Sequence, residues 1–478
     1  MHPIEQALLS SISKSPDTPL VVAYSGGVDS QVLLNALASL KQKNLFLNVV
    51  TVCHVNHGLS ENAIQWQEFA TQQCQHHNLA LRVHQVNIQP KAQQSLEALA
   101  RDARYKALQS IYNEPSLIIT GHHCDDQAET FLLALKRGSG LKGLSAMAKE
   151  TKQAKDLLVR PLLNISRAQI MDYATEHNLT WVEDESNTDT RFDRNFIRND
   201  IMPLLTKRWP SIINTINRSS EHCLAGQLLL DELAVDDLNI CLNDDKNLSV
   251  TALNKLSLAR FNNLVRYFLA QNYCLMPSTE QLSQLHQQLN ANIDKNPSVK
   301  VGDHYLRRYK KVLHLTADFQ RVSDWYVELK GLDKNQEIEL PDNLGKLQFS
   351  ESQPELAGRS DLNEARQSEA EVRQGNSKNL IITLPNTNSK VSIRFKHNNP
   401  SCLPDYRNHS RSLKKVMQEL DIPPWQRKRI PFLYYDNVLV AVIGYFVCQE
   451  YLAKLNEPCV EVAWFIPEPL QDAGFSWN

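Results

Sequence analysis

Six consecutive residues near the N-terminus carry the strongest chemical signal in the sequence. The run Ser25-Gly26-Gly27-Val28-Asp29-Ser30 stands between an apolar segment, 20–24, and a segment whose apolar residues have helical spacing. Adjacent glycines let backbone N–H groups approach phosphate oxygens, and a following helix N-terminus adds partial positive charge. A plain Gly-Gly turn is the alternative, which the full hexapeptide in this setting disfavours. No lysine follows as in GxxxxGK[ST], so a kinase-type γ-phosphate site is not predicted.

A second polar cluster, residues 121–130 with the sequence GHHCDDQAET, directly follows the apolar run 117–120. Ligands of open α/β sheets bind where the strands end, which is where this cluster falls. Asp126 and Glu129 are three residues apart and share one face if the segment is helical. Paired carboxylates suit Mg²⁺ or a substrate ammonium, and a solvated acidic helix start is the alternative. The histidines and Cys124 resemble zinc ligands, but no partner cluster has ligand spacing, so zinc is not favoured.

A third cluster, residues 183–199, mixes carboxylates with three arginines. An ordinary charged surface is one interpretation of this composition. Arg194 and Arg198 are four residues apart on an expected helix, however, and such a pair can clamp a phosphate or a nucleotide carbonyl where charge develops.

Short β-rich runs in the first third of the chain are expected to position these clusters. They are residues 20–24, 47–55, 81–86, 117–120 and 157–159, and segments with helical spacing separate most of them. Strands that alternate with helices predict a parallel α/β sheet with right-handed crossovers.

The rest of the chain has a different pattern. Residues 212–301 are helical in pattern, and 304–309 with 312–315 predict a β-hairpin that carries basic residues. Residues 350–379 have the composition of a poorly ordered linker. Strands are expected at 380–384, 391–395, 432–435 and 438–442. The prediction is a catalytic domain at 1–215, a helical substrate-binding domain at 216–320 and an α+β domain at 321–478, with an insertion at 351–379.

Composition limits the class of protein. The chain has 478 residues, of which 42% are hydrophobic and 22% charged, and its net charge is −2. These values exclude wholesale disorder and a globally basic nucleic-acid binder. No apolar run reaches the length of a membrane helix and no signal peptide is evident, so we expect a cytoplasmic protein without a membrane partner. Nine cysteines without a CxxC pair are expected to be reduced and mostly buried.

Taken together, the motifs resemble the PP-loop family of N-type ATP pyrophosphatases. Within it they are similar to the enzymes that attach lysine to a transfer RNA. The resemblance covers most of residues 20–205. It runs through the hexapeptide, HVNHGLS at 54–60, LEALARDARY at 96–105, GHHCDDQAET, LKRGSGLKGLSAM at 135–147, RPLL at 160–163 and the 183–199 cluster. Matches at 340–347 and 412–435 are looser.

The resemblance implies a reaction in two steps. ATP adenylates the C2 oxygen of the wobble cytidine in the CAU anticodon of an isoleucine tRNA, and the ε-amine of free L-lysine then displaces AMP. The product is lysidine, which changes the codon read from AUG to AUA. ATP and Mg²⁺ are the implied cofactors, with Ser25 to Ser30 as the ATP loop and Asp29 as a tentative Mg²⁺ ligand.

The resemblance also assigns roles to individual side chains. Asp29, Asp126, Glu129, Arg194 and Arg198 are the expected catalytic residues, and Asp126 with Glu129 would also bind lysine. Substrate contacts are expected from six further basic residues: Arg101, Arg104, Lys414, Lys415, Arg427 and Lys428. The last four lie in residues 390–430, where ten basic residues face three acidic ones. A solvated basic surface is the alternative there, and a homodimer is left open.

Three other functions were weighed. A PP-loop tRNA thiolase would resemble enzymes that carry CxxC or paired catalytic cysteines, and Cys53 and Cys124 are not so spaced; another adenylating RNA-modifying enzyme stays an alternative. An amidotransferase would need an N-terminal glutaminase segment. A non-enzymatic RNA-binding module would not need an intact PP-loop.

Overall fold

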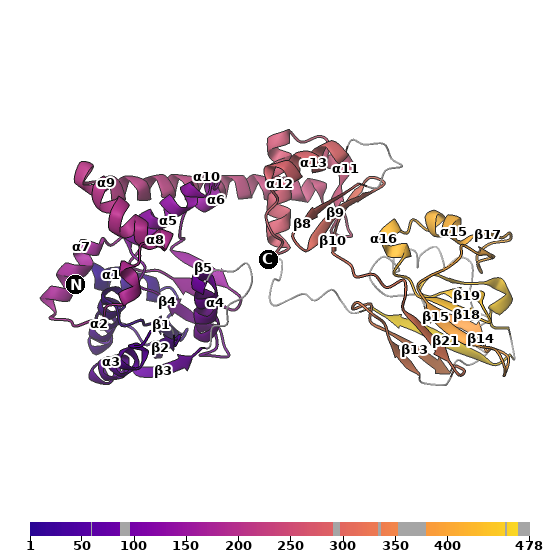
Figure 1. Ribbon diagram of the computed structural model, residues 1–478, viewed down its shortest axis with the longest axis horizontal. Coiled ribbons are helices and arrows are strands. Elements are labelled where there is room, and N and C mark those ends of the chain that lie inside the picture. The colour runs from indigo at the N-terminus through magenta and orange to yellow at the C-terminus, as the bar shows by residue number, and fades with distance from the viewer. Residues whose placement is uncertain are drawn as a thin grey trace. The chain divides into compact units, whose positions relative to one another are not determined.

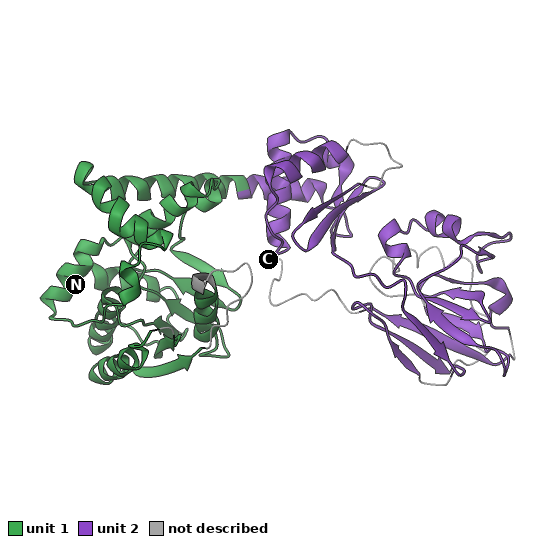
Figure 2. Ribbon diagram, viewed as in Figure 1, with its two compact units in different colours: residues 1–230, 473–478 green, residues 231–472 purple. Residues whose placement is uncertain are grey.

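The chain folds into two compact units (Figure 2). The computed structural model describes residues 1–58, 60–86, 96–289, 297–332, 336–351, 379–454 and 457–466. Described residues up to 230 form the first unit and those from 231 onward form the second. The finer division into three domains at 215 and 320 stays a prediction. The expected insertion lies outside the described residues, apart from its two end positions.

A six-stranded sheet forms the centre of the first unit (Figure 1). Its strands are β1 (Leu20–Ala23), β2 (Val50–Asn56), β3 (Ala80–Gln85), β4 (Leu117–Ile119), β5 (Glu150–Gln153) and β6 (Asp156–Val159). They lie in the order β3-β2-β1-β4-β6-β5, and every neighbouring pair is parallel except β5 with β6. The predicted parallel sheet is confirmed. The edge strand β5 was not predicted because its sequence, ETKQ, is polar and lacks the apolar run of a buried strand.

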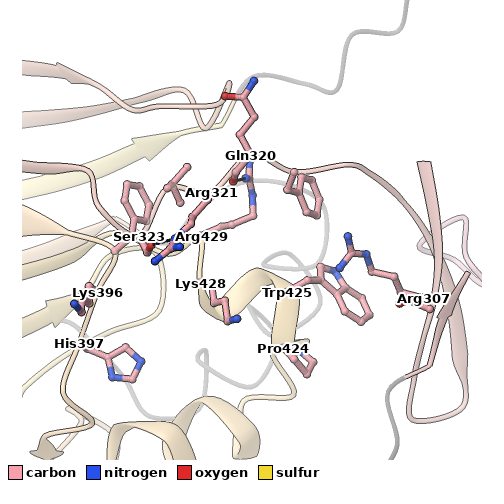
Figure 3. Close-up of a pocket in the computed structure, with 14 residues that line it drawn as sticks. Arg307, Gln320, Arg321, Ser323, Lys396, His397, Pro424, Trp425, Lys428 and Arg429 are labelled. Carbon is pink, nitrogen blue, oxygen red and sulfur yellow. Dashed lines mark hydrogen bonds between the residues drawn. The ribbon is translucent and has the colours of Figure 1, made fainter. Parts of the chain in front are cut away.

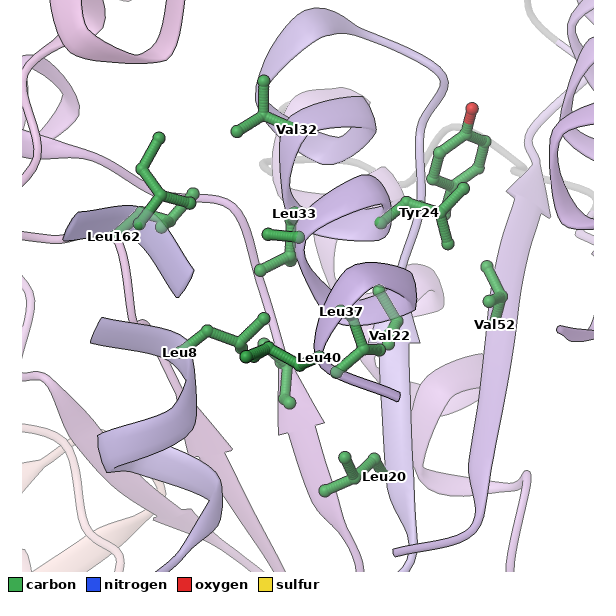
Figure 4. Close-up of a cluster of buried hydrophobic side chains, with 14 of the residues drawn as sticks. Leu8, Leu20, Val22, Tyr24, Val32, Leu33, Leu37, Leu40, Val52 and Leu162 are labelled. Carbon is green, nitrogen blue, oxygen red and sulfur yellow. The ribbon is translucent and has the colours of Figure 1, made fainter. Parts of the chain in front are cut away.

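Helices cover both faces of this sheet, as the alternation of side chains along β1 requires. Leu20 and Val22 point into a core shared with α1 (Pro3–Ile12), α2 (Val28–Gln42), α3 (Ala63–His76) and α7 (Arg167–Glu176). Val21 points to the opposite face, where it packs with Leu108 of α4 (Leu96–Gln109). Figure 4 shows the first core, in which Leu33 and Leu37 of α2 lie over the strands.

The strand order places a ligand site. The chain passes from β1 to β2 and β3 on one side of the sheet, and then returns to β4 on the other side of β1. Ligands of open α/β sheets bind at such a reversal, beyond the carboxyl ends of the two central strands. The hexapeptide follows β1 and the GHHCDDQAET segment follows β4, so both face this position.

The remaining elements of the first unit follow these strands. They are α5 (Cys124–Lys136), α6 (Leu141–Leu144), a 3₁₀ turn (Glu185–Thr188), α8 (Asp193–Phe196), a π-helical turn (Ile197–Ile201), α9 (Met202–Arg208) and α10 (Ile212–Cys241). Helix α10 continues into the second unit.

The second unit begins with helices and a small sheet. Its helices are α11 (Val250–Leu253), α12 (Leu258–Gln271) and α13 (Thr279–Leu289), and its strands are β7 (Leu248–Ser249), β8 (Ser298–Val301), β9 (His304–Tyr309) and β10 (Val312–Ala317). The predicted hairpin is confirmed as β9 and β10. The helical prediction for 298–301 is wrong: Val299 and Val301 alternate with polar residues and are buried, and the segment pairs with β9.

Two packed sheets form the C-terminal part of the second unit. One contains β11 (Tyr326–Leu329), β15 (Val391–Arg394), β18 (Phe432–Tyr435), β19 (Val438–Val442) and β20 (Phe446–Val447). The other contains β12 (Glu337–Glu339), β13 (Lys346–Glu351), β14 (Leu380–Thr383) and β21 (Cys459–Phe465). One core, which includes Phe349 and Ile393, joins the two sheets.

Short elements complete this part of the chain and give it its α+β character. They are β16 (Ser401–Cys402), β17 (Arg411–Ser412), α15 (Leu413–Glu419), α16 (Pro424–Arg427) and a 3₁₀ turn (Gln449–Tyr451). All four strands predicted here are confirmed. The nine cysteines are free thiols, eight of them buried, as expected.

Candidate active site

The hexapeptide forms a tight loop between β1 and α2. Gly26 has φ +90°, and a Cβ atom added there would lie 2.8 Å from Cγ2 of Val182. The Gly26 N–H donates to Ser30 Oγ at 3.1 Å, and the Ser30 hydroxyl donates to Gly27 O at 2.9 Å. Gly27 is the N-cap of α2 and makes no side-chain capping bond. The first-turn amide groups of α2 are therefore available to an anion.

The end of β4 lies directly against this loop. A Cβ atom on Gly121 would be 3.0 Å from the carbonyl oxygen of Asp29, so only glycine fits without a shift. Two residues further on, His123 is the N-cap of α5, and its Nδ1 accepts from Asp125 N at 3.2 Å. Asp126 Oδ2 accepts from His123 N at 3.0 Å, which fixes that carboxylate. This capping arrangement holds Asp126 toward Asp29.

Four predicted site residues form one ion-pair cluster at this position. Arg194 donates to Asp126 Oδ1 from Nη2 and to Glu129 Oε2 from Nε, both at 3.0 Å. Arg198 donates to Asp126 Oδ1 at 2.9 Å and contacts both oxygens of Glu129. Charge-assisted and bidentate bonds of this kind hold planar groups in fixed orientation. The structure thus joins the second and third sequence clusters.

Local packing brings the arginines to the carboxylates. Arg194 lies on α8 and Arg198 on the π-helical turn that follows it. Ile197 of that turn packs against Ala128 of α5 in a small apolar cluster. On the outer side, Lys136 at the end of α5 pairs with Asp193 at 2.6 Å. The two segments are therefore held together on both sides of the ion-pair cluster.

The charges around His123 set the protonation of the carboxylates. Burial raises the pKa of Asp126, but the positive charge of protonated His123, a state in which Nδ1 no longer accepts from Asp125 N, and that of Arg194 outweigh it and lower the pKa to about 2. Burial also raises the pKa of Asp29; His123 opposes this effect and Asp126 adds to it. His123 Nε2 lies 3.6 Å from Asp29 Oδ1 and 3.4 Å from Asp126 Oδ2. The imidazole therefore stands between the two acidic groups.

Three arginines act electrostatically on His122. Burial lowers the pKa of His122 to about 3. Asp126 raises this pKa, whereas Arg160, Arg194 and Arg101 lower it further. Of the predicted substrate-binding arginines, Arg101 contacts the ring of Tyr105 with its guanidinium at 5.2 Å. Burial lowers the pKa of His57 to about 4, with a contribution from Arg104. Both arginines therefore act electrostatically on histidines of the site.

One buried carboxylate oxygen without a hydrogen-bond partner in the described part of the chain fits a bound Mg²⁺ ion. Asp29 Oδ1 is buried and has no hydrogen-bond partner among the described residues. Mg²⁺ is commonly held by one or two carboxylates together with substrate phosphates, so Asp29 fits such an ion. Within the described ranges no three His, Cys, Asp or Glu side chains are arranged to hold a metal by themselves.

The other four predicted substrate-binding residues lie in the second unit. Lys414 and Lys415 are exposed on α15, and Lys428 is exposed at the end of α16. Arg427 is partly buried and donates to the carbonyl of Ile422 at 2.7 Å and to the Tyr309 hydroxyl at 3.3 Å. The three exposed lysines are thus the more accessible cations of this set.

Two residues of the site were not predicted in their roles. His123 was considered only as a zinc ligand; it forms a capping box with Asp126 in the structure, but the usual sequence pattern of that motif is Ser or Thr followed three residues later by Glu or Gln, so the sequence did not signal it. Arg160 is buried and donates to the carbonyl of Ala148 at 2.5 Å and to Thr151 Oγ1 at 3.1 Å. It belongs to the matched RPLL segment, but no local signal predicts that it lies near His122.

Comparison with known proteins gives the class first. Residues 1–205 match a family model described as a PP-loop domain, so fold and loop together define a PP-loop ATP-utilising enzyme. Models described as the TilS substrate binding domain and the TilS substrate C-terminal domain match residues 248–314 and 391–464. The chain belongs to the tRNA(Ile)-lysidine synthase family.

Individual relatives support this assignment over nearly the whole chain. The chain is 40% identical over 443 residues to the tRNA(Ile)-lysidine synthase of Vibrio vulnificus, covering 92% of this chain and 95% of the relative. It is 41% identical over 435 residues to that of Serratia proteamaculans, covering 90% and 92%. A solved U34-tRNA thiolase from Methanococcus maripaludis covers 46% of this chain and 78% of its own, with 17% identity and a TM-score of 0.38. That likeness is too low to bear on function.

The family assignment favours the ligase interpretation over the thiolase alternative. Burial raises the pKa of the thiols at Cys53 and Cys124 to about 12 and about 11, so both are protonated at neutral pH and are poor nucleophiles.

No helix in the described part of the chain has the length and apolar character needed to cross a bilayer.

Proposed function

We propose that this chain ligates free L-lysine to C2 of the wobble cytidine in the CAU anticodon of an isoleucine tRNA, using ATP and releasing pyrophosphate and AMP. The observation that carries the proposal is the ion-pair cluster of Asp126, Glu129, Arg194 and Arg198 beside the PP-loop aspartate Asp29. The same proposal places the reaction in the cytoplasm, where these substrates occur together.

The adenylation step needs an anion site for the leaving pyrophosphate. The open amide groups at the start of α2 supply it. Asp29 would hold Mg²⁺, which neutralises phosphate charge when bound. Held in this loop, ATP would present its α-phosphate to the base, so that positioning contributes much of the rate.

The lysine step needs a site that recognises an amino acid bearing both charges. Asp126 has a pKa of about 2, so it is ionised at neutral pH and attracts an ammonium. A carboxylate with so low a pKa is a poor proton acceptor, so its role in this proposal is electrostatic and not that of a general base. Arg194 and Arg198 would orient the carboxylates, and their positive charge would stabilise the departing phosphate of AMP.

Contact with tRNA is assigned mainly to the second unit. The exposed Lys414, Lys415 and Lys428 would contact phosphates, which position a nucleic acid without reading its sequence. Arg101 and Arg104 lie on α4 of the first unit, where they would face the anticodon end during catalysis.

The test is transfer of labelled lysine to tRNA with mapping of the labelled nucleotide. Wild-type protein with ATP and a CAU-anticodon isoleucine tRNA transcript should label the wobble position and release pyrophosphate. Asp29→Asn should abolish both, because Mg²⁺ would lose its carboxylate ligand and the phosphate charge would no longer be neutralised. Asp172→Asn, which alters an exposed aspartate on α7, is the matched control and should behave as wild type. Label at another nucleotide, or full activity of Asp29→Asn, would refute the proposal.

A further inference from the structure

A cavity of about 780 Å³ lies within the second unit, whereas the PP-loop belongs to the first (Figure 3). Arg307 reaches it from β9, and Phe319 from the segment that follows β10. Lys396 comes from the residues after β15, and Trp425 and Lys428 come from α16 and its C-cap. Neither the ATP site nor the ion-pair cluster includes this cavity, although one of its residues, Lys428, was expected to contact substrate.

The charge of the lining is strongly one-sided. Five of the 14 lining residues are arginine or lysine, and none is a carboxylate. Two of the five have acidic neighbours: Arg429 pairs with Asp342, and Arg321 lies 3.6 Å from Asp324. None of the ion pairs found in the described part of the chain includes Arg307, Lys396 or Lys428, although Asp318 acts on Arg307 electrostatically. Three cations without a bonded carboxylate that converge on one cavity favour an anionic occupant.

Aromatic side chains give the cavity a second recognition element. Trp425 makes T-shaped ring contacts with Tyr309, with centroids 6.1 Å apart, and with His314, at 5.3 Å. The guanidinium of Arg307 lies 5.7 Å from the centre of the Trp425 ring, and that of Arg429 lies 4.2 Å from the centre of Phe319. Indole rings and arginine planes are surfaces on which unpaired bases stack. The aromatic groups are therefore positioned before any ligand arrives.

We propose that this cavity binds an unpaired nucleotide of the tRNA substrate together with its flanking phosphates. The base would stack beside Trp425, and Arg307, Lys396 and Lys428 would each contact a phosphate. The proposal rests on the proposed function, because it takes the polynucleotide partner from it. The volume is in the range of cavities that hold a ligand of this size.

The shared chemistry, a phosphate beside a base, also describes a free nucleotide such as AMP. Two observations favour the polynucleotide. The three unpaired cations come from three separate segments of the chain, which suits several phosphates along a strand better than one phosphate group. In addition, no carboxylate lines the cavity to help hold the Mg²⁺ that accompanies ATP.

The first experiment measures the salt dependence of tRNA affinity with the full-length protein. Lys396→Ala/Lys428→Ala should weaken binding of the isoleucine tRNA transcript and lower the slope of log Kd against log salt by roughly 1.4 to 1.8, about 0.7 to 0.9 for each lost contact. Lys330→Ala/Lys454→Ala removes the same charge from exposed lysines of the same unit outside the cavity, and it should leave the slope unchanged. An unchanged slope in the folded Lys396/Lys428 variant overturns the proposal.

The second experiment separates stacking from charge. Trp425→Leu should weaken tRNA binding about tenfold with no change of slope, and Trp425→Phe, which keeps an aromatic face, should restore most of it. Circular dichroism and thermal unfolding establish that each variant is folded. Equal affinities for the Leu and Phe variants overturn the stacking part of the proposal.

The third experiment distinguishes the ligand source and the two levels of hypothesis. AMP is titrated alone against the wild type and against Lys396→Ala/Lys428→Ala, and its affinity should be the same for both. If the substitutions reduce the AMP affinity and leave the tRNA affinity unaffected, the proposal is overturned in favour of a free nucleotide. In lysine transfer, the variant should raise the KM for tRNA and leave kcat unchanged. Failure of the proposed function would instead appear in the wild-type protein, as absence of lysine transfer despite measurable tRNA binding.

Discussion

Arg198 holds both carboxylate oxygens of Glu129, with Nε 2.6 Å from Oε1 and Nη2 2.8 Å from Oε2. The Glu129 side chain is only 3% exposed, whereas that of Arg198 is 30% exposed. Because Glu129 is buried, its negative charge is stabilised by Arg198 and not by water. Arg198 is partly exposed to solvent and can therefore also contact a substrate.

This pair should matter for both stability and lysine use. Removing one partner of a buried ion pair leaves an uncompensated charge, at a cost of about 3 to 5 kcal/mol, so Glu129→Gln and Arg198→Gln should each lower the thermal unfolding midpoint. The double variant should lose less than the sum of the two. Glu129→Gln should also lower kcat/KM for lysine in single-turnover transfer, and Asp126→Asn should do the same.

The control for this prediction is the exposed pair between Lys136 of α5 and Asp193 of α8. Exposed pairs contribute about 0 to 1 kcal/mol, so Lys136→Gln/Asp193→Asn should hardly change the unfolding midpoint. Additive losses in the Glu129 and Arg198 variants would show that the two side chains do not act as a pair. Normal lysine KM and turnover in both carboxylate variants would place the amine elsewhere.

Gly26→Ala should abolish pyrophosphate release through two separate effects. The new methyl group would lie 2.8 Å from Val182 Cγ2, and φ +90° is costly for any residue with a Cβ, by about 1 to 3 kcal/mol. Adding Val182→Ala relieves the contact but not the backbone strain. The double variant should therefore regain thermal stability in part and remain defective in pyrophosphate release. Full recovery of both would mean that only the contact requires glycine.

His122 should make stability depend on pH. Burial lowers its pKa to about 3 in the folded protein, whereas an unfolded histidine has a pKa near 6.5. As pH falls below about 6.5, the unfolded chain takes up a proton that the folded one does not. The unfolding free energy should fall by up to about 1.4 kcal/mol per pH unit until the pKa of about 3 is reached.

The variant His122→Gln removes this contribution and should make the stability profile less steep between pH 6.5 and 5, above the range where unfolded Asp126 titrates; His57, whose pKa is also lowered, keeps part of the slope. Urea unfolding of the first unit, followed by circular dichroism at several pH values, measures the difference between variant and wild type. His177→Gln alters an exposed histidine on the same unit and serves as the control. Parallel profiles for His122→Gln and the wild type would contradict the assigned pKa.

Lys414→Ala/Lys415→Ala should raise the Kd for tRNA and lower its log-log salt slope by roughly 1.4 to 1.8, because both side chains are exposed on α15. ATP affinity should be unchanged, since the PP-loop belongs to the other unit. Nitrocellulose filter binding over a range of salt concentrations measures the slope. A slope equal to that of the wild type would mean that α15 presents only a solvated basic face.

The sequence was most informative where function depends on local backbone. The hexapeptide predicted its own tight loop, because glycine at position 26 permits the positive φ that the turn requires, and the apolar runs predicted the parallel strands. The alternation of apolar and polar residues carried information as well as the length of the apolar runs. The strand β8 was predicted as helix because the alternating Val299 and Val301 lie at the end of a region whose overall pattern is helical. The polar edge strand β5 has no such signal, since its partner β6 supplies its hydrogen bonds.

The tertiary structure decided which charged residues act together. Arg194 and Arg198 lie 65 to 72 residues from the carboxylates that they contact, and either group read alone resembles a solvated surface. Likewise, the ten basic residues of 390–430 look equivalent in sequence, yet Arg407 and Arg411 pair with Glu419, and Arg429 pairs with Asp342. The physical reason is that burial and long-range pairing set the free energy of a charge, and both depend on contacts that close only when the strands and helices pack.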